Sequence, residues 1–336
     1  MSVFERHAAP REGGAGIQVS PNAARVLDAL GALDALRERA VAPEAIELRD
    51  AATGHVLSRF LLGRTILDRH GAPYLVCARE ALREALEAVL PGSVRLRYGV
   101  SLERLRQFHD RAEAIWRDGE GEFDAVIGAD GVGSFTRRFV PGAASASPTG
   151  WNAWRRTEPD PGRGRVTTVD LAPHEHRVAY PLEGGRTNRV WIREARAGPP
   201  PGAWERWPVL RVEPGFAWTH DRIALIGDAA HAMTPYAAQG GAMALEDAAV
   251  LAHCMAASSH DLPSALGDYV RQRRARIEAV ARLSEGNRRI YHMDGAMRFA
   301  RDTVLRLLPQ PLLQRRMDFV YGWRLPIVTR TRAPIP

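Results

Sequence analysis

The sequence RIALIGDAAHAMTPYAAQGGAMALEDAAVLAHCM, residues 222–255, decides the predicted fold. It opens with a continuous apolar run, residues 223–226, which is typical of a strand buried on both faces of a parallel sheet. Gly227 and Asp228 follow, so a carboxylate lies just beyond the carboxyl end of that strand. Ligands of open α/β sheets bind at this edge. We therefore expect Gly227 and Asp228 to belong to a binding site.

The rest of the stretch predicts a loop followed by a helix. Pro235 stiffens the loop, and Gly240 and Gly241 allow a close backbone approach because they lack a Cβ atom. The helix is predicted from residue 242, with Glu246 and Asp247 in its early turns and with one apolar face formed by Leu245, Ala248, Ala249, Ala252 and Met255. A helix N-terminus beside an acid and two glycines suits a polar or anionic ligand. The alternative is an ordinary strand–loop–helix crossover.

The composition is that of a globular protein. At 336 residues the chain is long enough for one or two domains with a sizeable core. No apolar run reaches the roughly 18 residues that span a membrane, and no apolar signal segment is present at the N-terminus, so we expect a cytoplasmic protein. Cys77 and Cys254 are expected in the core rather than in a disulfide or a metal site, and no metal is predicted.

Every basic residue apart from histidine is an arginine. A net charge of +7 would suit a nucleic-acid-binding protein, but the arginines are spread among acids along the whole chain, and we predict no nucleic-acid partner. The densest group, at positions 271, 273, 274 and 276, is expected on a solvated helix face. The absence of lysine excludes Schiff-base chemistry, pyridoxal-phosphate catalysis and a P-loop.

Three motifs together resemble one enzyme family, the class A flavoprotein monooxygenases similar to salicylate hydroxylase. Residues 222–255 resemble its second flavin-binding motif, GADGVGS at residues 128–134 resembles its DG motif, and GIQVSPNA at residues 16–23 resembles its segment beside the flavin. The resemblance implies that FAD is the cofactor. It also implies cofactor contacts for Gln18, Asp130, Gly131, Gly227, Asp228, Pro235, Gly240 and Gly241.

Three further residues are assigned to FAD by the same resemblance. Glu5 and Arg6 match the positions that contact adenosine, and an acid after the second strand of a dinucleotide fold binds ribose hydroxyls. Arg79, at a strand–helix junction, matches an arginine that contacts the flavin cofactor. From the residues alone, a surface Glu-Arg pair and a surface arginine at a helix end are the alternatives.

In the resembled family, a first strand, a GxGxxG turn and a helix precede the strand that ends at Glu5. Gly13-Gly14-Ala15-Gly16 does not replace that turn, because it follows no strand and lacks the third glycine at the required spacing. We therefore expect the chain as given to bind FAD poorly and to aggregate. A truncated or degenerate relative that cannot bind FAD is one alternative for its function.

The predicted fold class is α/β, with a Rossmann-like FAD-binding domain, an interleaved β-rich substrate domain and a helical C-terminal region. The FAD-binding domain is expected at residues 1–40, 71–143 and 213–290. The substrate domain is expected at residues 41–70, which include a β-hairpin, and 144–212, and the C-terminal region at residues 291–336. Residues 94–98 and 112–116 are expected to be strands of a small meander.

The activity that the resemblance implies is hydroxylation of an aromatic acid or phenol, with NADH or NADPH as co-substrate and O2 as the oxygen source. His176 is the candidate base that deprotonates a phenol, and Tyr180 falls on the same strand face because side chains repeat every two residues. A structural histidine is the alternative at position 176. Another flavin oxidoreductase of the same superfamily and a non-enzymatic module are alternative functions, and oligomeric state is left open.

Overall fold

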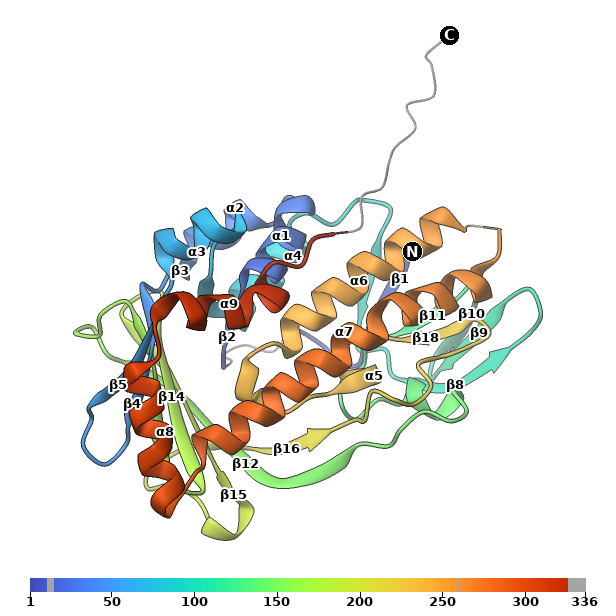
Figure 1. The fold of residues 1–336 in the computed structure, drawn as a ribbon. Coiled ribbons are helices and arrows are strands. Elements are labelled where there is room, and N and C mark those ends of the chain that lie inside the picture. Colours follow the sequence, from blue (N-terminus) through green and yellow to red (C-terminus); the bar gives the residue numbers. More distant parts are fainter. Residues whose placement is uncertain (11–14, 259, 326–336) are drawn as a thin grey trace.

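The computed structural model describes residues 1–10, 15–258 and 260–325 of the chain (Figure 1). The predicted α/β class is confirmed, since parallel and antiparallel strands alternate with helices along the chain. Gly13 and Gly14 of the glycine-rich segment lie outside the described residues. Within these ranges, no helix has the length and apolar character needed to cross a membrane.

A seven-stranded sheet brings residues 144–212 together with the predicted hairpin near residues 46–60, which is confirmed. In spatial order its strands are β16 (Glu205–Arg211), β12 (Ser147–Pro159), β15 (Arg186–Glu194), β14 (Glu175–Leu182), β13 (Val166–Ala172), β4 (Ala45–Asp50) and β5 (Val56–Leu61). β13 pairs with β4 in parallel, and the other neighbours are antiparallel. One face of this sheet is turned toward the flavin motifs.

Smaller sheets carry those motifs. β11 (Val126–Gly128) pairs in parallel with β18 (Ile223–Leu225), next to β17 (Thr219–His220), so the segments that follow β11 and β18 leave the same sheet edge. β2 (Gly16–Val19) and β3 (Ala40–Val41) flank β6 (Leu75–Ala78). β1 (Ser2–Glu5) pairs in parallel with β7 (Arg95–Tyr98).

The predicted meander is partly wrong. Residues 94–98 pair with β1, whereas the meander consists of β8 (Leu102–Gln107), β9 (Ala112–Trp116) and β10 (Gly119–Phe123). The alternating pattern of residues 94–98 indicates a strand but does not specify which edge that strand will join, because pairing depends on the register and burial of a distant partner.

Helices cover the sheets, and the long pair α6 and α7 lies side by side across the molecule (Figure 1). The α-helices are α1 (Pro21–Ala29), α2 (Leu33–Glu38), α3 (Gly63–His70), α4 (Arg79–Glu87), α5 (Asp228–His231), α6 (Gly240–Ala257), α7 (Leu262–Tyr291), α8 (Gly295–Leu307) and α9 (Gln310–Tyr321). Three short 3-10 helices are η1 (Thr136–Phe139), η2 (Ala195–Ala197) and η3 (Pro235–Ala237). α8 and α9 pack against β5 at the edge of the large sheet.

Two details of the predicted α6 are wrong. The helix begins at Gly240 rather than at residue 242, and its buried face is formed by Ala242, Met243, Glu246, Asp247, Val250, Leu251 and Cys254, while Ala248 and Ala252 are exposed. Glu246 and Asp247 therefore lie in the second and third turns and point inward. Apolar periodicity misplaces the buried face because ion pairs bury both acids. Cys77 and Cys254 are buried free thiols, as predicted.

Candidate flavin and substrate site

Gly227 turns the chain sharply at the end of β18. Its φ of 57° lies in the region that side chains disfavour, and a Cβ atom there would be 2.9 Å from the Cβ atom of Ala244. Its N–H donates to Oδ2 of Asp247 at 2.9 Å. Asp228 comes next as the first residue of α5 and is exposed. Among the described residues it is the carboxylate left open at this sheet edge, since Asp130 is engaged in its own loop.

The N-terminus of α6 approaches the same edge. A Cβ atom on Gly241 would lie 2.9 Å from Cδ1 of Ile17 in β2, and one on Gly240 would lie 3.8 Å from Oδ1 of Asp228. Pro235 is the first residue of η3, in the loop that precedes the helix. The glycine pair thus places free helix amides next to Asp228, where they suit a polar or anionic group.

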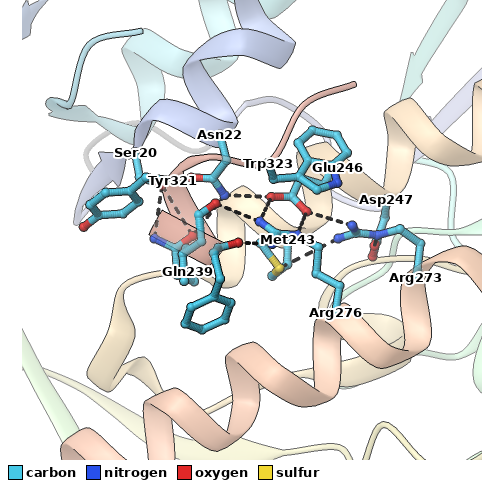
Figure 2. A network of polar contacts seen from close by, with 12 residues as sticks. Ser20, Asn22, Gln239, Met243, Glu246, Asp247, Arg273, Arg276, Tyr321 and Trp323 are labelled. Carbon is cyan, nitrogen blue, oxygen red and sulfur yellow. Dashed lines mark hydrogen bonds and ion pairs between the residues drawn. The ribbon is translucent and has the colours of Figure 1, made fainter. Parts of the chain in front are cut away.

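A buried network of polar side chains holds this loop in place (Figure 2). Glu246 accepts from Nδ2 of Asn22 at 2.7 Å and from Arg273 at 2.7 Å. Asp247 accepts from Nε of Arg273 at 2.7 Å and bonds Nε2 of His231 at 2.5 Å. The network therefore links the GIQVSPNA segment, the GDAAH loop, α6 and α7.

The charges within the network are matched. Burial alone raises the pKa of Asp247, but the side chains of His231 and Arg273 outweigh burial and hold that pKa below its usual value. The side chain of Arg273 is 1% exposed and that of Arg276, which also pairs with Glu246, is 14% exposed, so the prediction of a solvated arginine face is wrong at these two positions. The reason is that Arg273 neutralises two acids of the neighbouring helix, whereas Arg271 on the same helix is largely exposed.

The DG loop holds itself together and is tied to the GDAAH loop. The carboxylate of Asp130 accepts from Ser134 and, at 2.9 Å, from the N–H of Thr136, so it caps η1. Gly131 follows with a φ of 77°. The buried Arg137 donates to the carbonyls of Val132, at 2.9 Å, and of Ala229, at 2.8 Å. Asp130 therefore shapes this loop through its own hydrogen bonds.

The remaining predicted cofactor residues lie on separate elements. Glu5 ends β1 and accepts from the N–H of His7 at 2.9 Å, and Arg6 is exposed next to it. Gln18 in β2 accepts from the hydroxyl of Tyr74 at 2.5 Å. Arg79 is exposed at the start of α4.

Arg155 of β12 is a basic residue that sequence analysis missed. Burial lowers its pKa, and the positive charge of Arg79 lowers that pKa further. Arg155 stacks over the ring of Trp207 at 5.3 Å. In the described part of the chain, no carboxylate forms an ion pair with it. The sequence WNAWRR gives no signal that distinguishes Arg155 from a surface arginine.

His176 and Tyr180 lie on the face of β14 that is turned toward the flavin motifs. His176 is buried, and its ring centroid is 5.4 Å from that of Tyr236 in η3. Tyr180 is also buried and lies against Gly16, where a Cβ atom would be 2.8 Å from the tyrosine hydroxyl. Pairing of β12 through β15 to β14 places Arg155 on the same face. His176 and Tyr180 therefore approach the flavin motifs at different points, near η3 and near β2.

A hollow of about 660 Å³ between the β8–β9 turn and the start of α7 contains none of the predicted site residues. The candidate flavin and substrate site is therefore identified from its side chains and not from this hollow.

Comparisons with known proteins decide the family. The FAD binding domain family matches residues 211–284. A 3-hydroxybenzoate 6-hydroxylase of Polaromonas naphthalenivorans (strain CJ2) is 30% identical, with 97% of this chain and 90% of the relative covered. The chain belongs to the FAD-dependent aromatic monooxygenases.

Other relatives agree with this assignment. A 6-hydroxynicotinate 3-monooxygenase of Pseudomonas fluorescens is 31% identical over 85% of this chain and 84% of its own. The structure of HpxO from Klebsiella pneumoniae with FAD and uric acid has a TM-score of 0.81 at 23% identity, covering 95% of this chain and 90% of that one. That structure supports the shared fold.

As an FAD-dependent aromatic monooxygenase, the protein is an enzyme that uses FAD together with NADH or NADPH and acts on an aromatic compound. The residues present fit FAD in two respects: the glycines at 227 and 241 leave space that a Cβ atom would fill, and Asp228 is an open carboxylate beside the free amides of α6.

Proposed function

We propose that this monooxygenase hydroxylates a phenolic aromatic acid with O2 and that His176 removes the phenol proton. The observation that carries the proposal is the burial of His176, at 1% exposure, against Tyr236 of the loop between the GDAAH motif and α6. An imidazole at this position lies between the substrate-domain sheet and the flavin motifs. The histidines at 55 and 220, by contrast, are exposed.

When bound, the reduced flavin supplies activated oxygen, and the side chains of this chain prepare the ring that receives it. Removal of the phenol proton places negative charge on the ring, which makes the carbon atoms ortho and para to the oxygen more nucleophilic. Burial raises the pKa of Tyr180, so this hydroxyl stays protonated and serves as a hydrogen-bond donor rather than as a base. The apolar surroundings exclude water from the reaction.

An acid group on the substrate is supported by Arg155. Its guanidinium group is on the same sheet face as His176, is desolvated, and has no ion-pair partner among the described residues. Glu205 and Asp228 act on this cation without forming an ion pair with it, and a carboxylate is the group whose geometry a guanidinium binds best. Relatives named for hydroxybenzoates and hydroxynicotinate agree with a substrate that carries both a hydroxyl and a carboxylate.

The test uses 3-hydroxybenzoate as a probe substrate with the FAD-loaded enzyme. His176→Gln should slow hydroxylation about 10²-fold or more, which is the usual contribution of a general base, while the rate of flavin reduction by NAD(P)H stays within about twofold. Peroxide released per NAD(P)H consumed should rise. His55→Gln, which changes an exposed histidine in the turn between β4 and β5, is the matched control. Full coupling in His176→Gln would return His176 to a structural role.

A further inference from the structure

His176 does not stand alone but is bonded to a second histidine from a distant part of the chain. Its Nδ1 atom lies 2.9 Å from Nε2 of His292, although the two residues are 116 positions apart. The ring of His292 stacks on that of Trp151, with centroids 4.3 Å apart and an interplanar angle of 10°. The pair therefore joins β14, β12 and the end of α7.

The position of His292 is fixed from both sides. It is the C-cap of α7, where its N–H donates to the carbonyl of Arg288 at 3.2 Å. Arg301 of α8 is buried and donates to the carbonyls of Ile290 and Tyr291, at 3.1 and 3.0 Å. A buried arginine thus clamps the last turn of α7, so His292 meets His176 in one orientation.

The bond between two neutral imidazoles determines which nitrogen atoms carry hydrogen. If Nδ1–H of His176 donates to Nε2 of His292, then Nε2 of His176 keeps its lone pair and can accept a proton. In the described part of the chain His176 has no other hydrogen bond, so its Nε2 atom has no protein partner. If His292 were the donor instead, Nε2 of His176 would carry hydrogen and could not act as a base.

Both imidazoles are held in the neutral form. Burial lowers the pKa of His176 well below its ordinary value, with a smaller contribution from His292. Burial also lowers the pKa of His292 to about 4. The charged groups that act on His292 are Arg288 of α7, Arg301 of α8, and His174 and Glu194 of the β14 and β15 region. A proton taken by His176 is therefore unstable there and must be passed on.

We propose that His292 fixes the tautomer of His176 and then accepts its proton, so that the two residues form a relay from the substrate to the ring of His292. The O–H bond of the phenol breaks and its proton bonds to Nε2 of His176. The N–H bond at Nδ1 of His176 breaks and that proton bonds to Nε2 of His292, which then carries the positive charge as an imidazolium ion while the substrate is a phenolate. Nδ1 of His292 is buried and has no hydrogen-bond partner in the described residues, so the relay ends on this ring. The relay rests on the proposed role of His176.

The tautomer is tested without turnover, by nitrogen NMR of protein labelled with ¹⁵N-histidine, with His176→Gln and His292→Gln used to assign the signals. The expected result is hydrogen on Nδ1 and a lone pair on Nε2 for both His176 and His292 at neutral pH. Hydrogen on Nε2 of His176 would overturn the proposal, whatever the enzyme does in turnover. The wild-type spectrum decides this point even if a variant fails to fold.

The relay is tested by comparing two substitutions of His292. His292→Gln provides a side-chain oxygen that accepts from Nδ1 of His176 but cannot pass a proton on, so it should keep the His176 tautomer and still lower the rate of 3-hydroxybenzoate hydroxylation about tenfold. His292→Phe keeps the stacking on Trp151 and should also release the tautomer. Wild type should show a solvent deuterium isotope effect on hydroxylation that falls in both variants, and His55→Gln should keep it.

A full rate in His292→Gln would overturn the relay and leave a positioning role alone. If His176→Gln hydroxylates normally while the tautomer is as expected, the proposed function fails and the histidine pair is structural. The two failures are therefore distinguishable.

Discussion

Two buried polar clusters of this monooxygenase differ in charge, because one consists of ion pairs and the other of neutral histidines. In the network beneath the flavin loop, Glu246 and Asp247 are neutralised by Arg273 and Arg276 and are bonded on several sides. In the cluster on the substrate-domain sheet, His176 and His292 are neutral. Two buried polar atoms nearby, the hydroxyl of Tyr236 and Nδ1 of His292, have no partner among the described residues.

The difference follows from what each cluster must do. A fully satisfied charge network has one low-energy arrangement, and it fixes the backbone that holds a cofactor. Buried polar atoms without partners are costly and rare in native proteins, and a group of them needs an explanation. Such atoms are spread over the molecule, and two of them, the hydroxyl of Tyr236 and Nδ1 of His292, lie where the substrate is proposed to bind. Their unused hydrogen-bonding capacity is consistent with a substrate that binds and is then released.

The largest effect is expected from breaking the charge network. Arg273→Met leaves Asp247 without its arginine and Glu246 with Arg276 alone, and loss of one partner from a buried ion pair costs about 3–5 kcal/mol of unfolding free energy. Arg271→Met, on the exposed side of the same helix, should cost at most about 1 kcal/mol because surface ion pairs contribute little. Denaturant unfolding of both variants measures the contrast. Similar losses would show that the network does not hold the fold.

The open carboxylate at the flavin loop should matter for the cofactor rather than for stability. Asp228→Ala removes a charged hydrogen-bond acceptor, so FAD binding should weaken by about 1.5–3 kcal/mol, while the unfolding free energy of the apoprotein changes little because Asp228 is exposed. Fluorescence titration with FAD measures this. Asp124→Ala, at the amino end of β11, is the matched control. Unchanged FAD affinity would remove Asp228 from the site.

The flavin side could be predicted largely from sequence because its information is local. A strand, a glycine with positive φ, an acid and a glycine-rich helix start follow one another within about twenty residues, and each has a backbone reason to be there. The buried face of α6 could not be predicted the same way. Glu246 is buried because Asn22, Arg273 and Arg276, all distant in sequence, bond to it.

The substrate side was much less accessible to sequence reasoning. His176 and Tyr180 could be chosen from strand periodicity, but nothing in the pattern connects His176 with His292 or Trp151. Their contact is created by the end of α7, which α8 clamps, and by the pairing of β12, β15 and β14. Long-range contacts of this kind depend on the whole fold and cannot be predicted from the residues that are adjacent in sequence.

A change in pH should alter the unfolding free energy through one cluster and not the other, and this is the smallest of the expected effects. A carboxyl with a depressed pKa, such as Asp247, contributes stability that is lost only as pH falls below its unfolded value of 3.8, so this carboxyl causes no change in stability between pH 8 and pH 5. His292 behaves differently, because its pKa falls from 6.5 to about 4 on folding. The unfolded chain binds a proton that the folded chain excludes, so stability is full above pH 6.5 and falls as the pH drops toward 4. The loss from His292 at pH 5 is on the order of 2 kcal/mol.

Urea unfolding at pH 8 and pH 5 should show a smaller loss in His292→Phe than in wild type, whereas His55→Gln should lose as much as wild type. An equal loss in all three proteins would mean that His292 is already charged or solvated in the folded state, and the contrast between a charged and a neutral cluster would be wrong.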